Sequence, residues 1–146
     1  MLALDHDATA LANVPRQSDS ELAADPRIVR VLTYLHAHFV ERISIDTLAA
    51  LACVSASAFH RMFRRHTRMT MVDYLTRLRV GRACSLLIGT PAPIATIASD
   101  AGYTNLSLFN RQFTRLKGES PSSFRKRHRV VLGRGAAPSQ ELVSQV

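Results

Sequence analysis

The sequence predicts an all-α protein of about seven helices, built from two homeodomain-like helix-turn-helix units joined by one long central helix. Apolar residues recur three or four positions apart, as they do on one face of a helix, from about residue 28 to residue 124. One helix-turn-helix pattern also occurs twice along the chain. With 146 residues the chain is long enough for one compact functional unit and too short for a large catalytic domain with a second module.

The first unit is expected to begin with a helix that starts at Pro26. Asp25 can cap this helix, and proline is favoured at the first helical position. Ser44 and Ser55 can cap a short second helix and a longer third helix that carries an apolar stripe. A short helix, a tight turn and another helix predict a helix-turn-helix motif over about residues 44–66.

A longer apolar pattern predicts a linker helix over about residues 70–88, which ends at Gly89 and two prolines shortly after it. The pattern then restarts and predicts a second helix-turn-helix motif over about residues 94–117. Gly102 is expected in its turn, and Asn105 can cap its second helix.

The folded domain is expected to span residues 26–128 and to end with a short helix that Ser120 and Pro121 begin. Residues 1–25 hold one arginine and five acidic residues without a sustained apolar period, so we expect a flexible acidic leader. Residues 129–146 contain two glycines and a proline without periodicity, which predicts a disordered tail.

The internal repeat relates both the aromatic and the polar positions of the two units. At an offset of 50 residues, the first unit's Ser55, Ser57, Phe59, Arg61, Phe63 and Arg65 match the second unit's Asn105, Ser107, Phe109, Arg111, Phe113 and Arg115. Just upstream the offset is 49, so the second unit has one extra residue between turn and helix. The linker of about 18 residues would be about 27 Å long, close to the spacing of about 34 Å between successive major grooves of DNA.

Basic residues are concentrated in the part of the chain that is predicted to fold. The whole chain has a net charge of +8, and residues 26–129 hold 17 Lys and Arg against five Asp and Glu. A basic folded region is the electrostatic footprint of a protein that binds nucleic-acid phosphates. Double-stranded DNA is therefore the expected partner.

Other classes of function are disfavoured. No apolar run reaches the roughly 20 residues of a membrane span and no signal-peptide pattern is present, so we expect a cytoplasmic protein that lies on the nucleoid when bound. The histidines lack metal-ligand spacing, and no phosphate loop or nucleophile motif occurs. We expect no cofactor and no enzymatic activity. A repair methyltransferase would need a four-cysteine zinc site, whereas Cys53 and Cys84 stand alone.

The apolar stripes of the third and sixth helices leave outward faces that suit contact with DNA bases. On the third helix this face holds Ser57, His60, Arg61 and Arg64. On the sixth helix it holds Ser107, Asn110, Arg111 and Thr114. Arginine can bond guanine bidentately, and asparagine can do so with adenine. Leu106 lies three residues before Phe109 on the apolar stripe, so packing is its favoured role and contact with a thymine methyl group is the alternative.

A second set of residues is expected to contact phosphates. Near the far ends of the two helices lie Arg64, Arg65, Arg115 and Lys117, which we expect to neutralise the DNA backbone. The helix starts at Ser44, Ser55 and Asn105 can present backbone N–H groups to phosphate. For each arginine the alternative is a solvated surface charge.

Two segments carry a family resemblance. The second unit contains a glycine-aromatic pair, Phe-x-Arg-x-Phe, Gly-x-Ser-Pro and a closing aromatic-Arg pair within GYTNLSLFNRQFTRLKGESPSSFRK, residues 102–126. The first unit contains ISIDTLAALACVSASAFHRMFRRHTRMTMVDYLTRLRVGRACSLL. Together they resemble the DNA-binding domain of the AraC/XylS family of bacterial transcription regulators over about residues 26–128.

That resemblance implies a sequence-specific regulator whose third and sixth helices enter adjacent major grooves and which often activates RNA polymerase. Carried over position by position, the base contacts fall on Ser57, His60, Arg61, Leu106, Ser107, Asn110 and Arg111. Most members also carry an effector-binding domain, for which residues 1–25 are too short. We therefore expect either a stand-alone regulator or the DNA-binding portion of a longer one, with any effector domain missing or separate.

Two positions depart from the family pattern. Arg68 stands where glycine usually follows the first recognition helix, and a left-handed arginine would cost about 1 kcal/mol. Cys53 likewise replaces a frequent glycine in the first turn. The alternative function is a nonspecific DNA-binding or protein-interaction module that has lost specific readout, and for such a module Arg61 and Arg111 would be dispensable.

Overall fold

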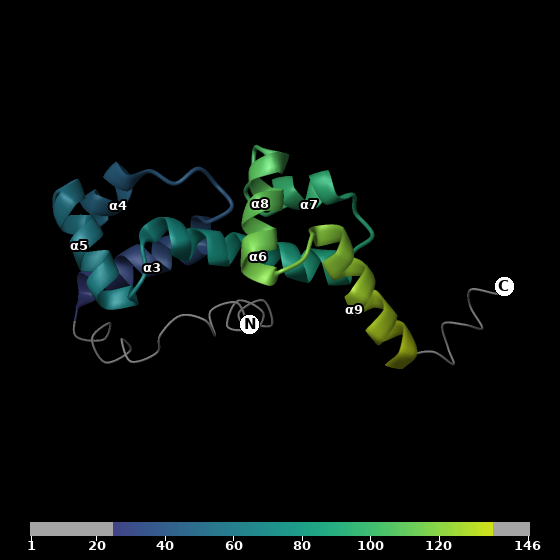
Figure 1. Cartoon of the computed structure of the whole chain (residues 1–146). Helices are drawn as coiled ribbons and strands as arrows, with labels where there is room; N and C mark the ends of the chain where they lie inside the picture. The colour runs from purple at the N-terminus through teal and green to yellow at the C-terminus, as the bar shows by residue number, and fades with distance from the viewer. Residues whose placement is uncertain (1–24, 136–146) are drawn as a thin grey trace.

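The computed structural model describes residues 25–135, and these form seven α-helices and no strand, as the sequence predicts. The first unit consists of α3 (Pro26–His38), α4 (Ile45–Leu51) and α5 (Ala56–Thr67). The second consists of α7 (Ile94–Asp100), α8 (Leu106–Lys117) and α9 (Pro121–Gly135). The long helix α6 (Met71–Gly89) passes through both units (Figure 1). No helix in this range is long and apolar enough to cross a membrane.

Six of the seven described helices begin at a polar side chain that accepts a hydrogen bond from an N–H of the first turn. Asp25 accepts from the N–H of Arg27 at 3.0 Å. The other five caps each accept from the residue three positions further on, and they are Ser44, Ser55, Thr70, Asn105 and Ser120. Thr70 is an additional cap, and the five predicted caps are confirmed, because capping depends on residue type and local spacing alone.

The internal repeat extends beyond the recognition helices, since α6 serves both units. Its first half follows α5 as α9 follows α8. Tyr74 on α6 and Phe124 on α9 are 50 residues apart and have equivalent partners. The ring of Tyr74 meets that of Phe63 at 5.4 Å and 87°, and the ring of Phe124 meets that of Phe113 at 5.4 Å and 82°. Such edge-to-face pairs add about 0.5–1.5 kcal/mol to the burial of the rings.

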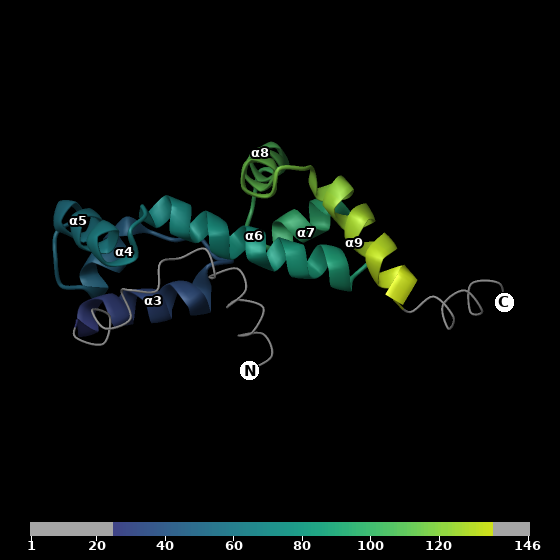
Figure 2. The ribbon, with the colours of Figure 1, turned by 60° about the horizontal axis from the view of Figure 1, so that its bottom comes forward.

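Two hydrophobic cores divide α6 between them. The first core ends at Leu78, and the second begins at Val80. Each is centred on two fully buried phenylalanines, Phe59 and Phe63 in the first unit and Phe109 and Phe113 in the second. Figure 2 shows the two units beside different parts of α6. The helix is therefore a shared structural element rather than an exposed linker.

Arg79 lies at the boundary between the two cores and joins the units. Its Nε donates to the carbonyl of Phe39 at 2.8 Å, and its Nη2 donates to the carbonyl of Glu41 at 2.9 Å. Its guanidinium also lies 5.8 Å from the ring centroid of Tyr103, in the second unit. One side chain on α6 thus contacts the end of α3 and the turn before α8.

Gly102 brings that turn directly against the first unit. It has a φ of +103°, and a Cβ atom built on it would lie 2.9 Å from the Cα of Val40 and 2.9 Å from the Nε of Arg79. Only glycine fits both the backbone conformation and this close approach. The relative placement of the two units therefore depends on this residue.

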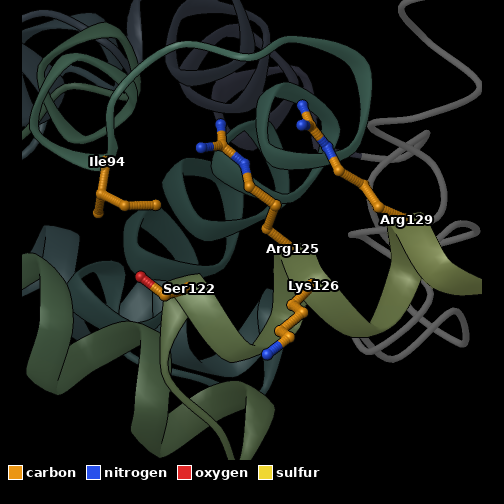
Figure 3. A pocket seen from close by; sticks show the side chains of 5 residues that line it. All are labelled: Ile94, Ser122, Arg125, Lys126 and Arg129. Atoms are coloured by element: carbon orange, nitrogen blue, oxygen red, sulfur yellow. The ribbon is translucent and has the colours of Figure 1, made fainter. Parts of the chain in front are cut away.

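The end of α6 is held by α9 in the same way that α6 holds the end of α3. Arg125 donates to the carbonyls of Leu87, Thr90 and Ala92, and Arg129 donates to that of Thr90. Figure 3 shows both guanidinium groups directed toward the loop after α6. Arg129 lies 50 residues after Arg79, so the repeat includes these carbonyl-capping arginines.

The left-handed positions match between units although their residue types differ. In the first unit Arg68 has a φ of 65°, and the equivalent Gly118 of the second unit has a φ of 76°. Cys53 in the first unit has a φ of 58°, and its equivalent in the second unit is Gly102. Arg68 and Gly118 each donate a backbone hydrogen bond to the residue four positions earlier. The turns thus close alike in the two units, and the first unit tolerates two side chains where glycine is usual in the family.

The final helix is longer than predicted. The sequence predicts a folded domain that ends at residue 128, whereas α9 reaches Gly135. Residues 122–132 contain neither glycine nor proline, and nothing in their sequence ends the helix earlier. The predicted leader up to residue 24 and the remaining tail, residues 136–146, lie outside the described residues.

Gly102→Ala is expected to destabilise the domain by about 2–4 kcal/mol, because backbone strain adds to overpacking against Val40. Gly118→Ala is the matched control, since its φ is also positive but nothing lies within 4 Å of its added Cβ. The control should lose only about 1 kcal/mol. Urea denaturation of the two variants measures the difference, and equal losses would show that the contact at Gly102 carries no energy of its own.

Candidate nucleic-acid interface

The two recognition helices each bury one face and expose a polar one. α5 buries Phe59, Met62 and Phe63, and α8 buries Phe109 and Phe113. All seven predicted base-contacting residues are exposed, namely Ser57, His60, Arg61, Leu106, Ser107, Asn110 and Arg111. In Figure 1 both helices run across the direction of α6, with α5 beside its first turns and α8 further along. The structure thus presents two separate polar faces.

Leu106 is a correction to the packing role that the apolar pattern favoured. It is the first residue of α8, and its side chain is 44 % exposed. Tyr103 lies against Phe109, with ring centroids 5.2 Å apart, and fills that part of the core. Leu106 therefore lies on the outer surface beside Ser107.

The predicted phosphate-contacting residues are also exposed, and they fall into two groups. Three of them use their side chains to cap helices: Ser44, Ser55 and Asn105. The other four are cationic side chains in the last two turns of α5 and α8: Arg64, Arg65, Arg115 and Lys117. Arg115 Nη2 lies 3.9 Å from Asp73 Oδ1 in an exposed ion pair. Such a pair contributes little stability, so this arginine can exchange the carboxylate for a phosphate.

Arg27 is a cation beside α5 that no motif in the sequence pointed to. It lies on the first turn of α3 and helps to line a groove of about 440 Å³ between α3, the turn before α5 and α5 itself. The groove is lined by Arg27, Val54, Ala58, Arg61, Met62 and Arg65. Three arginines thus meet around an apolar floor.

Asp25 holds Arg27 in place. It accepts from the Nε of Arg27 at 3.1 Å and from its Nη2 at 3.0 Å, in addition to capping α3. The hydrogen bonds from Arg27 hold the pKa of Asp25 at about 2, below its usual value of 3.8. The buried ring of His66 also contacts Asp25, with its Nε2 3.5 Å from Asp25 Oδ2. The Nδ1 of the same ring donates to the carbonyl of Met62 at 2.9 Å. This network ties the start of α3 to the end of α5.

The cysteines take no part in either exposed face. Cys84 lies within α6, and burial raises the pKa of its thiol to about 11, so the thiol stays protonated at neutral pH. Cys53 is exposed in the turn between α4 and α5, and both cysteines are free.

A basic, duplicated helix-turn-helix with an exposed polar face on each second helix defines a DNA-binding domain with two recognition helices. A family model described as a helix-turn-helix domain matches residues 48–127. The chain belongs to the AraC/XylS family of transcription regulators. This confirms the family resemblance seen in the two sequence segments.

Individual relatives and solved structures agree with this assignment. The transcriptional activator RhaS of Enterobacter sp. (strain 638) is 32% identical over 102 residues, which are 70% of this chain and 37% of RhaS. The regulatory protein SoxS of Escherichia coli (strain K12) is 33% identical over 97 residues, which are 66% of this chain and 91% of SoxS. The DNA-binding domain of AdpA, solved in complex with a target DNA, superimposes with a TM-score of 0.68 at 29% identity, covering 73% of this chain and 95% of that domain.

The chain spans only about a third of the length of several longer relatives, RhaS among them, whereas it spans nearly all of SoxS.

Acid is expected to weaken the network at Asp25. Because the pKa of this carboxyl is about 2 in the folded protein and 3.8 in the reference state, its stabilising effect is complete above about pH 4 and is lost as the pH falls to 2. Asp25→Asn keeps a good capping residue but removes the titration. Urea denaturation between pH 5 and pH 2 should show a steeper loss of stability for the wild type than for the variant. Parallel curves would contradict the ion pair.

Proposed function

We propose that the protein is a sequence-specific regulator of bacterial transcription that places α5 and α8 in two adjacent major grooves of one asymmetric DNA site. The observation that carries the proposal is the pair of equivalent recognition helices spaced along one rigid helix. α6 has 19 residues and is about 28 Å long, the same order as the roughly 34 Å between successive major grooves. The AdpA domain, which has this fold, was solved with a target DNA.

The two faces are expected to recognise different half-sites because their residues differ. On α5 the proposed base contacts are Ser57, His60 and Arg61, and on α8 they are Leu106, Ser107, Asn110 and Arg111. Arg61 and Arg111 suit guanine, Asn110 suits adenine, and the exposed Leu106 suits a thymine methyl group. A single chain with unlike recognition helices binds an asymmetric site without a dimer.

The phosphate contacts are proposed to hold each helix in its groove. Cationic contacts come from Arg64, Arg65, Arg115 and Lys117, and helix starts at Ser44, Ser55 and Asn105 supply backbone N–H groups. These contacts are independent of base sequence. They position the domain, whereas the base contacts select the site.

Activation is the proposed outcome of binding. RhaS, which shares this domain, is a transcriptional activator by name. We infer that the bound protein contacts RNA polymerase, and that it acts in the cytoplasm, on the nucleoid when bound.

Selection from a randomised duplex library tests the proposed function. The purified chain should enrich one asymmetric site with two half-sites about one helical turn, or about 10 base pairs, apart. Binding titrations at several salt concentrations should then separate the selected site from a scrambled one. Enrichment of no motif, with only steeply salt-dependent binding, would leave the nonspecific or protein-interaction module as the function.

Alanine variants separate base contacts from phosphate contacts. Arg61→Ala and Arg111→Ala should each cost about 1–3 kcal/mol on the selected site and relax the sequence preference of one half-site. Arg65→Ala should weaken binding to selected and scrambled duplexes equally and reduce the salt slope. Fluorescence anisotropy measures both quantities. Identical behaviour of the three variants would contradict the division of roles.

A further inference from the structure

We propose that Arg27, at the start of α3, is a DNA phosphate contact, and that the groove it forms with Arg61 and Arg65 receives the sugar-phosphate backbone along one side of α5. The inference rests on the proposed function and adds a residue from outside both helix-turn-helix motifs to the DNA interface. Its ligand is a phosphodiester of one strand beside the half-site that α5 contacts.

The shape and chemistry of the groove suit a sugar-phosphate segment. Ala58, Arg61 and Arg65 lie along one side of α5, and Arg27 faces them from α3. Val54 and Met62 complete an apolar floor within a volume of about 440 Å³. A deoxyribose can pack on such a floor while its phosphates meet the guanidinium groups of Arg27 and Arg65, which form bidentate bonds with phosphate oxygens, and Arg61 keeps its proposed contact with a base.

The charges in the groove are available to a ligand. Among the described residues, Arg61 and Arg65 have no ion-pair partner. Arg27 donates two hydrogen bonds to Asp25, so three of the five N–H donors of its guanidinium remain. Its side chain is 44 % exposed. Even with the charge of Asp25 included, three arginines leave the groove at about +2.

Arg27 is also held in a fixed position before any ligand binds. Asp25 grips its guanidinium bidentately, and Asp25 itself contacts the buried His66 of α5 at 3.5 Å. A long side chain that is already ordered loses less conformational entropy on binding than a free one. This arrangement distinguishes Arg27 from the solvated surface charge that the sequence alone would suggest.

In a second basic groove of the described residues, two of the three cations are already engaged. This groove has a volume of about 420 Å³ and is lined by Ile94, Ser122, Arg125, Lys126 and Arg129. Figure 3 shows Arg125 and Arg129 turned toward the loop after α6, where they donate to backbone carbonyls. Their charges therefore stabilise the fold, and the groove in the first unit is the stronger phosphate site.

Arg27→Gln tests the inference, with Arg127→Gln as the matched control. Arg127 is an exposed arginine that also pairs with a carboxylate, Glu119, but it lies on α9, away from the groove. For Arg27→Gln we expect binding about five- to tenfold weaker at about 0.1 M salt, on selected and scrambled duplexes alike, and a slope of log K against log salt smaller by about 0.9. Arg127→Gln should change neither quantity, and Arg27→Lys should retain the slope.

The outcomes of this binding experiment distinguish a phosphate contact, a base contact and an effect of net charge. Thermal melting first establishes whether both glutamine variants are folded. If Arg27→Gln is unfolded, the affinity and salt slope of Arg27→Lys test the inference instead. A folded Arg27→Gln that keeps the wild-type affinity and slope would overturn the phosphate contact, and so would an equal loss in Arg127→Gln, which would reflect net charge alone. A loss confined to the selected sequence would make Arg27 a base contact instead. If the wild type selects no sequence at all, the proposed function fails rather than this inference.

Discussion

The contact between Gly102 and Val40, just after α3, joins the two units directly, beside the shared helix α6 that packs into both cores. The absent side chain at Gly102 lets the turn before α8 meet Val40, and Arg79 bonds the carbonyls of Phe39 and Glu41 across the same boundary. A protein that must match two grooves at once needs its two units joined firmly, because a misplaced second helix loses its contacts.

The repeat explains how one short chain provides two recognition helices on similar supports. Each unit places a phenylalanine of its recognition helix against an aromatic residue of the following helix. Arg79 donates to carbonyls just after α3, and Arg129 donates to a carbonyl just after α6. The interiors of the two units are therefore alike, whereas their exposed residues differ. For example, the first unit has His60 beside Arg61 where the second unit has Asn110 beside Arg111. A duplicated scaffold can thus recognise an asymmetric target.

Net charge overstates how many cations face the DNA. Arg79, Arg125 and Arg129 donate to backbone carbonyls and close the ends of helices. Arg27 is shared between Asp25 and the groove, and Arg61 and Arg65 are unpaired among the described residues. The same residue type therefore serves the fold in one place and the proposed ligand in another, and only the neighbours of each side chain distinguish the two roles.

The sequence by itself determined what depends on residues a few positions apart: the seven helices, their caps, the left-handed turn positions and the outward faces of α5 and α8. Tertiary structure decided what depends on residues distant in the chain. Arg79 meets Phe39 across 40 positions, and Arg27 joins a groove with Arg65. Periodicity shows which face of a helix is apolar, but it does not show which element, distant in the sequence, packs against that face.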